Sequence, residues 1–185
     1  MSSISEHTTK LFINELLTFI HTGMDGMILD LRGNGGGYLE EASKFLGHFL
    51  PQGEITVKSE YHAYQAVNLR SEGKGELANI PMVILIDQLT ASAGEIIALT
   101  LQEQGILVIG MPSFGKGSIQ TFTELPDGSS LKYTIGKRYS PHHVNINGTG
   151  VIPDMEVQWN YEMYQTNGTD TQLEKAKEEL LNIIK

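Results

Sequence analysis

The sequence contains no cysteine. This absence excludes disulfide bonds, thiolate metal sites and a cysteine nucleophile together. Basic residues are also scarce: 13 Lys and Arg stand against 22 Asp and Glu, which gives a formal net charge of -9 and a pI near 5.1. Nucleic acids and anionic membranes require a concentrated basic surface, so the composition argues against binding to either of them.

Long apolar runs are missing as well. No stretch approaches the ~20 residues that cross a bilayer, so we expect no integral membrane segment, and the opening MSSISEHTTK is not a signal peptide. If the natural protein is exported, we expect this chain to be a piece of it. The 185 residues, 40% of them hydrophobic, suit one globular domain without repeats or low-complexity tracts. We predict a single domain over 1–185, in which 162–172 is a linker to a C-terminal helix at 173–185.

Short apolar runs of strand length alternate along the chain with segments of helical spacing. The 3.6-residue period predicts helices near 12–20, 38–50, 95–104 and 173–185. Apolar runs bounded by turn residues predict buried strands at 26–31, 80–87 and 106–110. A polar segment at 54–79 predicts strands or a hairpin with its tip near 70–76, and two β-rich runs flank Pro126-Asp127-Gly128. The pattern predicts an α/β domain with a largely parallel sheet, a β-rich C-terminal part and a C-terminal helix.

The segment GMPSFGKGSIQ, residues 110–120, approaches the phosphate-binding pattern G-x-x-x-x-G-K. A working P-loop needs Ser or Thr after its lysine to hold magnesium, and then a helix whose N–H groups face the phosphates. Here Gly117 follows Lys116, and the β-rich run SIQTFTEL has no helical period. We therefore exclude a nucleotide phosphate site at this lysine.

A glycine cluster, RGNGGG, follows the first predicted strand. A dinucleotide fingerprint starting at Gly33 would need glycine where Tyr38 stands, so this interpretation fails too. A glycine-rich turn between a strand and a helix nevertheless exposes backbone N–H groups. Such groups can bind an anion, including the transient oxyanion of acyl transfer.

Ser92 and Glu95 have the S-x-x-E spacing of a capping box before an apolar helical run. The same geometry also suits catalysis. A serine at a strand-to-helix turn exposes its hydroxyl, and the N–H of Ala93 points toward a developing negative charge with help from the helix N-terminus. Ser92 is therefore either a helix cap or a nucleophile beside an oxyanion donor.

A serine nucleophile needs a general base. No recognisable triad context surrounds any of the histidines, which are His7, His21, His48, His62, His142 and His143. A lysine can replace histidine if burial lowers its pKa from ~10.4 to about 7 to 8, because only a neutral amine accepts a proton. Lys116 is the candidate, and Gln120 lies on the same face of the predicted strand and can orient the amine. The alternative is a hairpin lysine with a surface glutamine.

Four motifs, in the order MILDLRGNGGG, TASAGEI, FGKGSIQ and GVIPDMEV, resemble those of the carboxy-terminal processing peptidases, or tail-specific proteases, of bacteria and chloroplasts. The resemblance covers nearly the whole chain and implies a crotonase-like α/β core with a Ser/Lys dyad assisted by Gln. It makes Ser92 the nucleophile, Lys116 the general base and Gln120 the partner that orients the base. The oxyanion donors that it implies are backbone N–H groups of Ala93 and of Gly35 or Gly36.

The resemblance also has departures and wider implications. Family members often read S-A-S-A-S-E, so Thr90 and Gly94 replace the flanking serines here. They usually carry a PDZ domain, which we do not expect within this chain. The resemblance implies a serine endopeptidase that processes or degrades proteins from or near their C-terminus, needs no metal or cofactor and binds its substrate as an extended strand. It also implies an extracytoplasmic location, in the periplasm or cell envelope of a bacterium.

Two other functions are compatible with the same fold. A non-catalytic binding module would have no need to keep Ser92, Lys116 and Gln120 together. An acyl-CoA enzyme of crotonase type would share the oxyanion turn, would not need the Ser/Lys pair and should bind an adenine nucleotide moiety. The peptidase interpretation accounts for all three residues.

Overall fold

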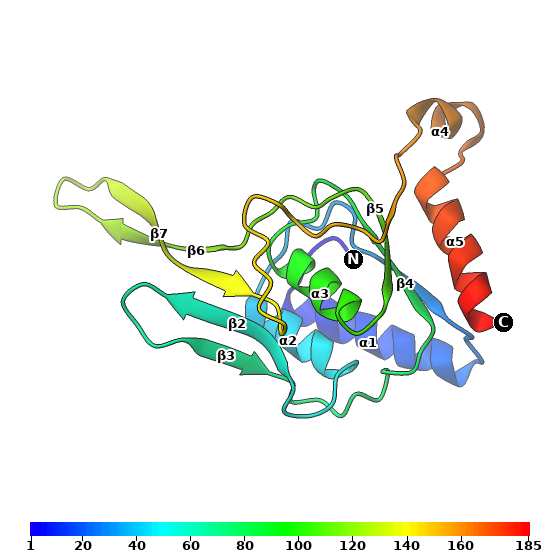
Figure 1. Ribbon diagram of the computed structural model, residues 1–185, viewed down its shortest axis with the longest axis horizontal. Helices are drawn as coiled ribbons and strands as arrows, with labels where there is room; N and C mark the ends of the chain where they lie inside the picture. Colours follow the sequence, from blue (N-terminus) through cyan, green and yellow to red (C-terminus); the bar gives the residue numbers. More distant parts are fainter.

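The computed structural model describes all residues, Met1–Lys185, and combines helices with two separate sheets (Figure 1). The helices are α1 (Glu6–His21), α2 (Leu39–Gly47), α3 (Ala93–Gln102), α4 (Tyr161–Asn167) and α5 (Thr171–Ile184). The strands are β1 (Met27–Asp30), β2 (Ile55–Tyr61), β3 (Val67–Arg70), β4 (Met82–Ile86), β5 (Leu107–Gly110), β6 (Ser118–Glu124), β7 (Ser130–Tyr139) and β8 (Met155–Glu156). None of the helices combines the length and the apolar character needed to cross a membrane.

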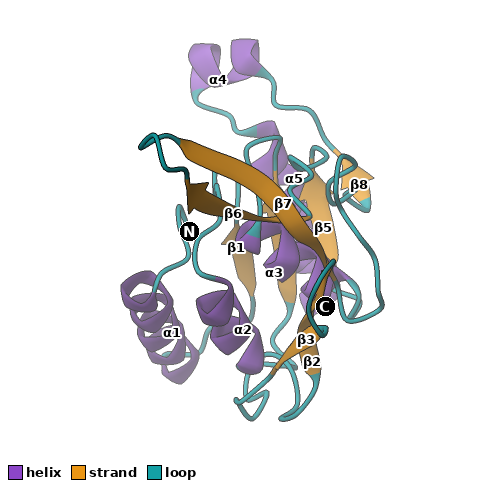
Figure 2. Ribbon diagram, turned by 90° about the vertical axis from the view of Figure 1, so that its left-hand side faces the viewer, coloured by secondary structure: helices purple, strands orange, loops and turns teal.

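A parallel sheet with the strand order β1-β4-β5-β8 forms the centre of the domain. Successive side chains of β4 point to opposite faces of this sheet. Ile84 and Ile86 pack in the larger core with residues of α1, α2 and α3. Val83 and Leu85 pack on the other face with Ala176 of α5. The domain therefore has three layers, with α1, α2 and α3 on one face of the sheet and α5 on the other (Figures 1 and 2).

The second sheet is antiparallel and has the strand order β3-β2-β7-β6. Its β6–β7 hairpin extends away from the body of the domain (Figure 1). Strand β6 pairs only with β7, so its other edge is open. The predicted fold class, a layered α/β core with a parallel sheet, a β-rich part and a C-terminal helix, is confirmed.

The tip of the β2–β3 hairpin differs from the prediction. The turn joining the two strands spans 62–66, whereas we expected a tip near 70–76. In the structure Gly73 packs against the end of α2, where a Cβ on it would lie 2.1 Å from the carbonyl oxygen of Gly47. The glycines of this segment thus permit close backbone contact. Composition alone does not distinguish this use of glycine from its use in a turn.

The segment expected to be a linker, 162–172, contains most of α4 and the start of α5. Asn160 caps α4 by accepting the N–H of Met163, and Gly168 ends that helix with a left-handed φ of 73°. Asp170 then caps α5 by accepting the N–H of Leu173. Two successive polar caps therefore make two helices of this region.

Three loops leave neighbouring strands at the carboxyl edge of the parallel sheet. They are the glycine turn (33–37) after β1, the serine turn (87–92) after β4 and the lysine loop (111–117) after β5. The three strands are adjacent and run in the same direction, so the loops emerge side by side. Open parallel sheets bind their ligands at this edge.

Candidate active site

The side chains predicted to be catalytic share one cavity. A cavity of about 190 Å³ is lined by Ser92, Lys116, Ser118, Gln120, Phe122, Lys132 and Arg138. An adjoining cavity of about 620 Å³ shares Lys116 and Gln120 with it and also reaches Gly35. The fold therefore brings Ser92, Lys116 and Gln120 together from the serine turn, the lysine loop and the edge strand β6.

Ser92 has an unusual backbone conformation, with φ 56° and ψ -118°. His143 is the only other non-glycine residue with a positive φ. A conformation of this kind costs about 1–3 kcal/mol and persists only where the surrounding structure imposes it, most often at functional sites. The residue is 9% exposed and directly precedes α3. This strained turn places the hydroxyl at the N-terminus of a helix, where a nucleophile benefits from the helix dipole.

A buried carboxylate connects the serine turn to the lysine loop. Glu95, in the first turn of α3, has no exposed surface. Its Oε2 accepts the backbone N–H of Ser92 at 2.7 Å and that of Lys116 at 2.9 Å. Its Oε1 accepts the hydroxyl of Ser113 and the N–H of Gly115, both at 2.6 Å. Four donors compensate the charge for its loss of water and fix the two loops relative to each other.

The S-x-x-E spacing predicts only a capping-box role for Glu95. The bond from the Ser92 N–H to Glu95 is one half of that motif and is present. One feature of the sequence pointed to the role of Glu95 in joining the two loops. Its carboxylate lies in the otherwise apolar run AGEIIAL. A charge in a buried helix needs several hydrogen-bond donors, and these come from residues distant in the sequence.

The lysine loop is fixed on its other side by the segment 146–151. The hydroxyl of Ser113 accepts the N–H of Val151 at 2.7 Å, and the N–H of Gly148 donates to the carbonyl of Gly115 at 2.9 Å. Gly115 has φ +87°, and a Cβ on it would lie 3.0 Å from the nitrogen of Gly150. Only glycine fits this position without displacing the loop.

Further hydrogen bonds connect the three loops to one another. Asp87 Oδ1 accepts the N–H of Gly33 at 2.9 Å. Thr90 donates its hydroxyl to the carbonyl of Leu31 at 2.9 Å, and its own carbonyl accepts the N–H of Phe114 at 3.0 Å. Thr90, at a position where members of the family that the sequence resembles often have serine, thus keeps a hydroxyl that holds the serine turn in place.

The glycine turn packs directly on the serine turn. Gly36 has φ +99°, and a Cβ on it would lie 2.8 Å from the Ala91 carbonyl and 2.9 Å from Ser92 Cβ. The side chain of the fully buried Asn34 accepts the Gly36 N–H at 2.8 Å. The Asn34 backbone carbonyl accepts the N–H of Ala91, also at 2.8 Å. Contact this close requires glycine at 36.

The predicted oxyanion donors differ in their availability. The N–H of Gly36 is already bonded to Asn34. The N–H groups of Gly35 and Ala93 have no acceptor within the chain. Gly35 is exposed and lines the adjoining cavity of about 620 Å³, while Ala93 is the first residue of α3. Both N–H groups are therefore unpaired, but Ala93 is fully buried and lines neither cavity, so of the two only Gly35 is reached from a cavity.

Lys116 and Gln120 are exposed residues. The Lys116 amine forms no ion pair within the chain, and no hydrogen bond joins it to the Ser92 hydroxyl; the one bond of the lysine runs from its backbone to Glu95. A lysine base needs burial to favour its neutral form, and the chain alone does not bury Lys116. Hydrogen bonds between catalytic groups are often long in free enzymes and tighten when substrate binds.

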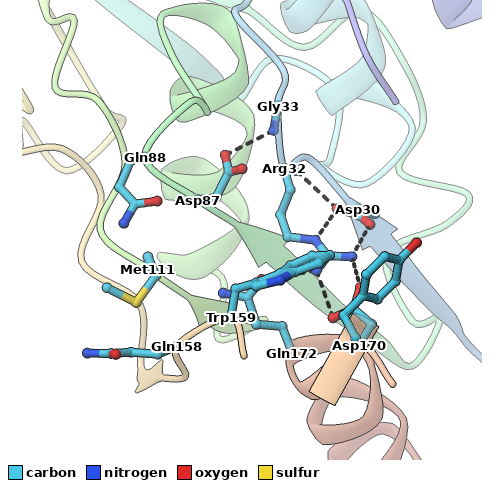
Figure 3. Close-up of a pocket in the computed structure, with 11 residues that line it drawn as sticks. Asp30, Arg32, Gly33, Asp87, Gln88, Met111, Gln158, Trp159, Asp170 and Gln172 are labelled. Atoms are coloured by element: carbon cyan, nitrogen blue, oxygen red, sulfur yellow. Dashed lines mark hydrogen bonds and ion pairs between the residues drawn. The ribbon is translucent and has the colours of Figure 1, made fainter. Parts of the chain in front are cut away.

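A separate cavity of about 800 Å³ contains none of the predicted catalytic residues (Figure 3). At its centre Arg32 Nη2 lies 2.7 Å from Asp30 Oδ2 and 2.8 Å from Asp170 Oδ2. The guanidinium also lies 6.0 Å from the centroid of the Trp159 ring. Burial alone would lower the pKa of Arg32, but hydrogen bonds to the two carboxylates raise it above its ordinary value. These contacts attach α5 to the end of β1, so the arginine has a structural role.

Comparisons with known proteins agree with the resemblance. The sequence model of peptidase family S41 matches residues 1–157. A carboxyl-terminal-processing protease of Picosynechococcus sp. is 35% identical over 179 residues, which cover 94% of this chain and 42% of that protein. The carboxy-terminal processing protease CtpA of Bacillus subtilis is 33% identical over 159 residues, which cover 85% of this chain and 34% of that protein. The chain thus spans less than half the length of these relatives.

A solved structure has the same fold. It is that of a photosystem II D1 C-terminal processing protease, with a TM-score of 0.76 and 29% sequence identity over 85% of this chain and 41% of that one. The family match covers most of the chain, and both relatives exceed 30% identity over more than two thirds of it. The chain therefore belongs to peptidase family S41, together with the carboxyl-terminal-processing proteases.

Proposed function

We propose that this chain is the catalytic core of a serine endopeptidase that uses Ser92 as nucleophile, Lys116 as general base and Gln120 as the partner of the base. One observation carries the proposal. Side chains singled out from two separate motifs line the same cavity, next to a serine turn with a strained backbone. Strain of this kind is typical of residues held in position for chemistry.

The reaction follows from the roles of these groups. The hydroxyl oxygen of Ser92 attacks the scissile carbonyl carbon while the neutral amine of Lys116 takes the hydroxyl proton. The ammonium then gives this proton to the leaving amine, and an acyl-enzyme ester remains on Ser92. Water attacks the ester by the same route, with Lys116 as base, and the acid product leaves with Ser92 restored. The amide oxygen of Gln120 orients the amine. Because the amide is neutral, it does not favour the charged ammonium, whereas a carboxylate in its place would.

The oxyanion formed in this attack needs hydrogen-bond donors that are not used elsewhere. We assign this role to the backbone N–H groups of Ala93 and Gly35, because neither has an acceptor within the chain. The Gly36 N–H instead holds the Asn34 side chain and so supports the turn.

The open edge of β6 is the proposed site of substrate binding. Ser118, Gln120 and Phe122 alternate along this strand and line the cavity. An extended peptide paired with the β6 backbone would therefore pass over the cavity. Such a peptide would also cover Lys116 and remove water from it, which favours the neutral amine that the mechanism needs.

The substrates are proposed from the relatives. The named relatives are carboxyl-terminal-processing proteases, one cyanobacterial and one from Bacillus. We therefore assign this chain to the cleavage of proteins at or near their C-terminus. The corresponding location is outside the cytoplasm, in the periplasm or cell envelope of a bacterium.

Hydrolysis of an unfolded protein such as casein tests the proposal. Ser92→Ala and Lys116→Ala should each lower the rate by at least about 10³-fold without unfolding the domain. Lys137→Ala removes an exposed lysine that does not line the cavity around Ser92, and it should leave the rate unchanged. Activity retained in either dyad variant would contradict the mechanism.

A serine-reactive phosphonate separates the peptidase from a non-catalytic binding module of the same fold. The proposed enzyme should be labelled on Ser92, and the Ser92→Ala variant should not be labelled. A chain that stays unlabelled while it remains folded would favour the binding module.

A further inference from the structure

The cavity around Ser92 is basic although the protein as a whole is acidic. Its lining includes Lys116, Lys132 and Arg138 and contains no Asp or Glu. The adjoining cavity also includes the two lysines and lacks acidic residues. The chain carries a formal net charge of -9, so this concentration of cations is local. A cleft lined by charges of one sign attracts ligand groups of the opposite sign.

Arg138 is held firmly by its backbone but not by its side chain. Its N–H donates to the carbonyl of Gly117 at 2.8 Å, and its carbonyl accepts the side-chain amide of Asn145 at 2.6 Å. The guanidinium forms no ion pair or hydrogen bond within the chain, and its Nε is buried without a partner. Burial lowers the pKa of Arg138, and the Coulombic interactions with Tyr61 and Glu40 oppose this effect. Arginine nevertheless keeps its proton in proteins, so a cation lies in the cavity without a counter-ion.

Lys132 and Arg32 differ from Arg138 in having partners, whereas Lys116 has none but is exposed. Lys132 Nζ lies 5.4 Å from the centroid of the Phe122 ring. Arg32, in the separate cavity, is paired with Asp30 and Asp170. A buried charged donor without an acceptor costs folding free energy. Buried donors of this kind normally have an acceptor in at least one state of the protein, such as the ligand-bound state. The Nε of Arg138 is such a donor, and a ligand bound in the cavity can supply its acceptor.

We propose that Arg138 forms a subsite that binds a carboxylate of the substrate peptide close to the scissile bond. The guanidinium can donate two parallel hydrogen bonds to a carboxylate, and no acidic side chain in the cavity competes for it. This inference rests on the proposed peptidase function and names its substrate class. The carboxylate belongs either to an Asp or Glu side chain or to the end of the substrate chain.

Binding to the inactive Ser92→Ala protein tests the subsite without hydrolysis. The probes are fluorescein-labelled octapeptides of Ala and Val, followed by fluorescence anisotropy. One peptide ends in a free carboxylate and its match ends in an amide. Further amidated peptides carry Glu at each central position in turn, and their matches carry Gln.

We expect at least one carboxylate peptide to bind about 10-fold more tightly than its neutral match. Preference for the free terminus would identify the chain-terminal carboxylate, and preference for Glu would identify an acidic side chain. Adding Arg138→Gln to the Ser92→Ala protein should reduce the preference to within about twofold. Arg138→Lys keeps the charge but loses the two-pronged geometry, so its preference should be intermediate.

Lys137→Gln is the matched control, because it removes one positive charge from the adjacent position of β7. Lys137 is exposed and does not line the cavity around Ser92, so this variant should keep the preference. The subsite is overturned if no carboxylate peptide is preferred, if none binds measurably, or if the preference survives Arg138→Gln. Loss of the preference in Lys137→Gln as well would also overturn it, since general charge would then be the cause.

The outcome is separable from that of the proposed function. The Arg138 subsite is measured by binding alone, whereas the dyad is measured by casein hydrolysis. An enzyme that hydrolyses casein but shows no carboxylate preference contradicts only the subsite. A protein that binds carboxylate peptides through Arg138 but never hydrolyses casein contradicts only the peptidase.

Discussion

The backbone N–H of Ser92 donates to Oε2 of Glu95 at 2.7 Å. The same carboxylate oxygen accepts the backbone N–H of Lys116 at 2.9 Å. A single buried side chain therefore sets the relative position of both members of the proposed dyad. It does so through their backbones, which leaves the hydroxyl and the amine free for the substrate.

Glu95→Gln should therefore affect both stability and activity. A glutamine has only one acceptor oxygen, so its NH₂ group would face two of the four donors that Glu95 now accepts. We expect the free energy of unfolding to fall by about 2–4 kcal/mol, and casein hydrolysis to be lost as the two loops shift. Urea denaturation and the casein assay measure the two effects.

Glu54→Gln is the control for Glu95→Gln, because Glu54 is exposed. Its effect on stability should stay within about 0.5 kcal/mol. If Glu95→Gln also stayed within this range and kept full activity, the carboxylate would not position the dyad.

Two substitutions of Ser92 should differ in stability although both abolish activity. Its φ of 56° and ψ of -118° disfavour any residue with a Cβ, so Ser92→Ala keeps the strain. Ser92→Gly relieves about 1–3 kcal/mol of strain and loses about 0.5–1 kcal/mol through the greater freedom of the unfolded chain. We expect the glycine variant to be more stable than the alanine variant by about 1 kcal/mol in urea denaturation. A glycine variant of equal or lower stability would show that the turn is not strained.

Adjacent glycines of the glycine turn should respond differently to alanine. A Cβ on Gly36 would clash with the Ala91 carbonyl at 2.8 Å, and its φ is +99°. We expect Gly36→Ala to lose about 2 kcal/mol or more of stability and to lose activity as the serine turn moves. A Cβ on Gly35 meets nothing within 4 Å, and alanine keeps the N–H assigned to the oxyanion. Thermal unfolding and casein hydrolysis should therefore be nearly unchanged in Gly35→Ala, and equal damage in the two variants would contradict this assignment.

The residues that the sequence predicts for the candidate site are those that depend on local pattern. Ser92 and Lys116 lie in short motifs beside turns, and alternating strands and helices place those turns at one edge of a sheet. The role of Glu95 depends on Ser113, which is 18 residues away, so the S-x-x-E spacing revealed only the local bond. Arg138 reaches the cavity through the pairing of β7 with β2 and β6, and no local pattern specifies that register.

Two functions of Asp170 can be separated by substitution. Its carboxylate pairs with Arg32 at 2.8 Å and caps α5 by accepting the Leu173 N–H at 3.0 Å. Asp170→Asn keeps a capping oxygen but loses the charge, so we expect a loss of about 1–2 kcal/mol in stability. Asp170→Ala should lose about 1 kcal/mol more, because the cap is also removed. Urea denaturation at pH 7 measures both losses, and equal values would show that the cap contributes nothing.

The contribution of Asp170 should also depend on pH. Burial alone would raise the pKa of Asp170, but the hydrogen bond and charge of Arg32, together with the Leu173 N–H, lower it below the ordinary value of 3.8. A group with a lower pKa in the folded state stabilises the fold fully above its unfolded pKa, and this stabilisation is lost as the pH falls through the folded pKa. The stability difference between the natural chain and Asp170→Asn should therefore be constant from pH 5 to 7 and shrink below about pH 4. Urea denaturation at constant ionic strength measures this difference, and a difference that did not change with pH would mean that the charge on Asp170 does not stabilise the contact between α5 and β1.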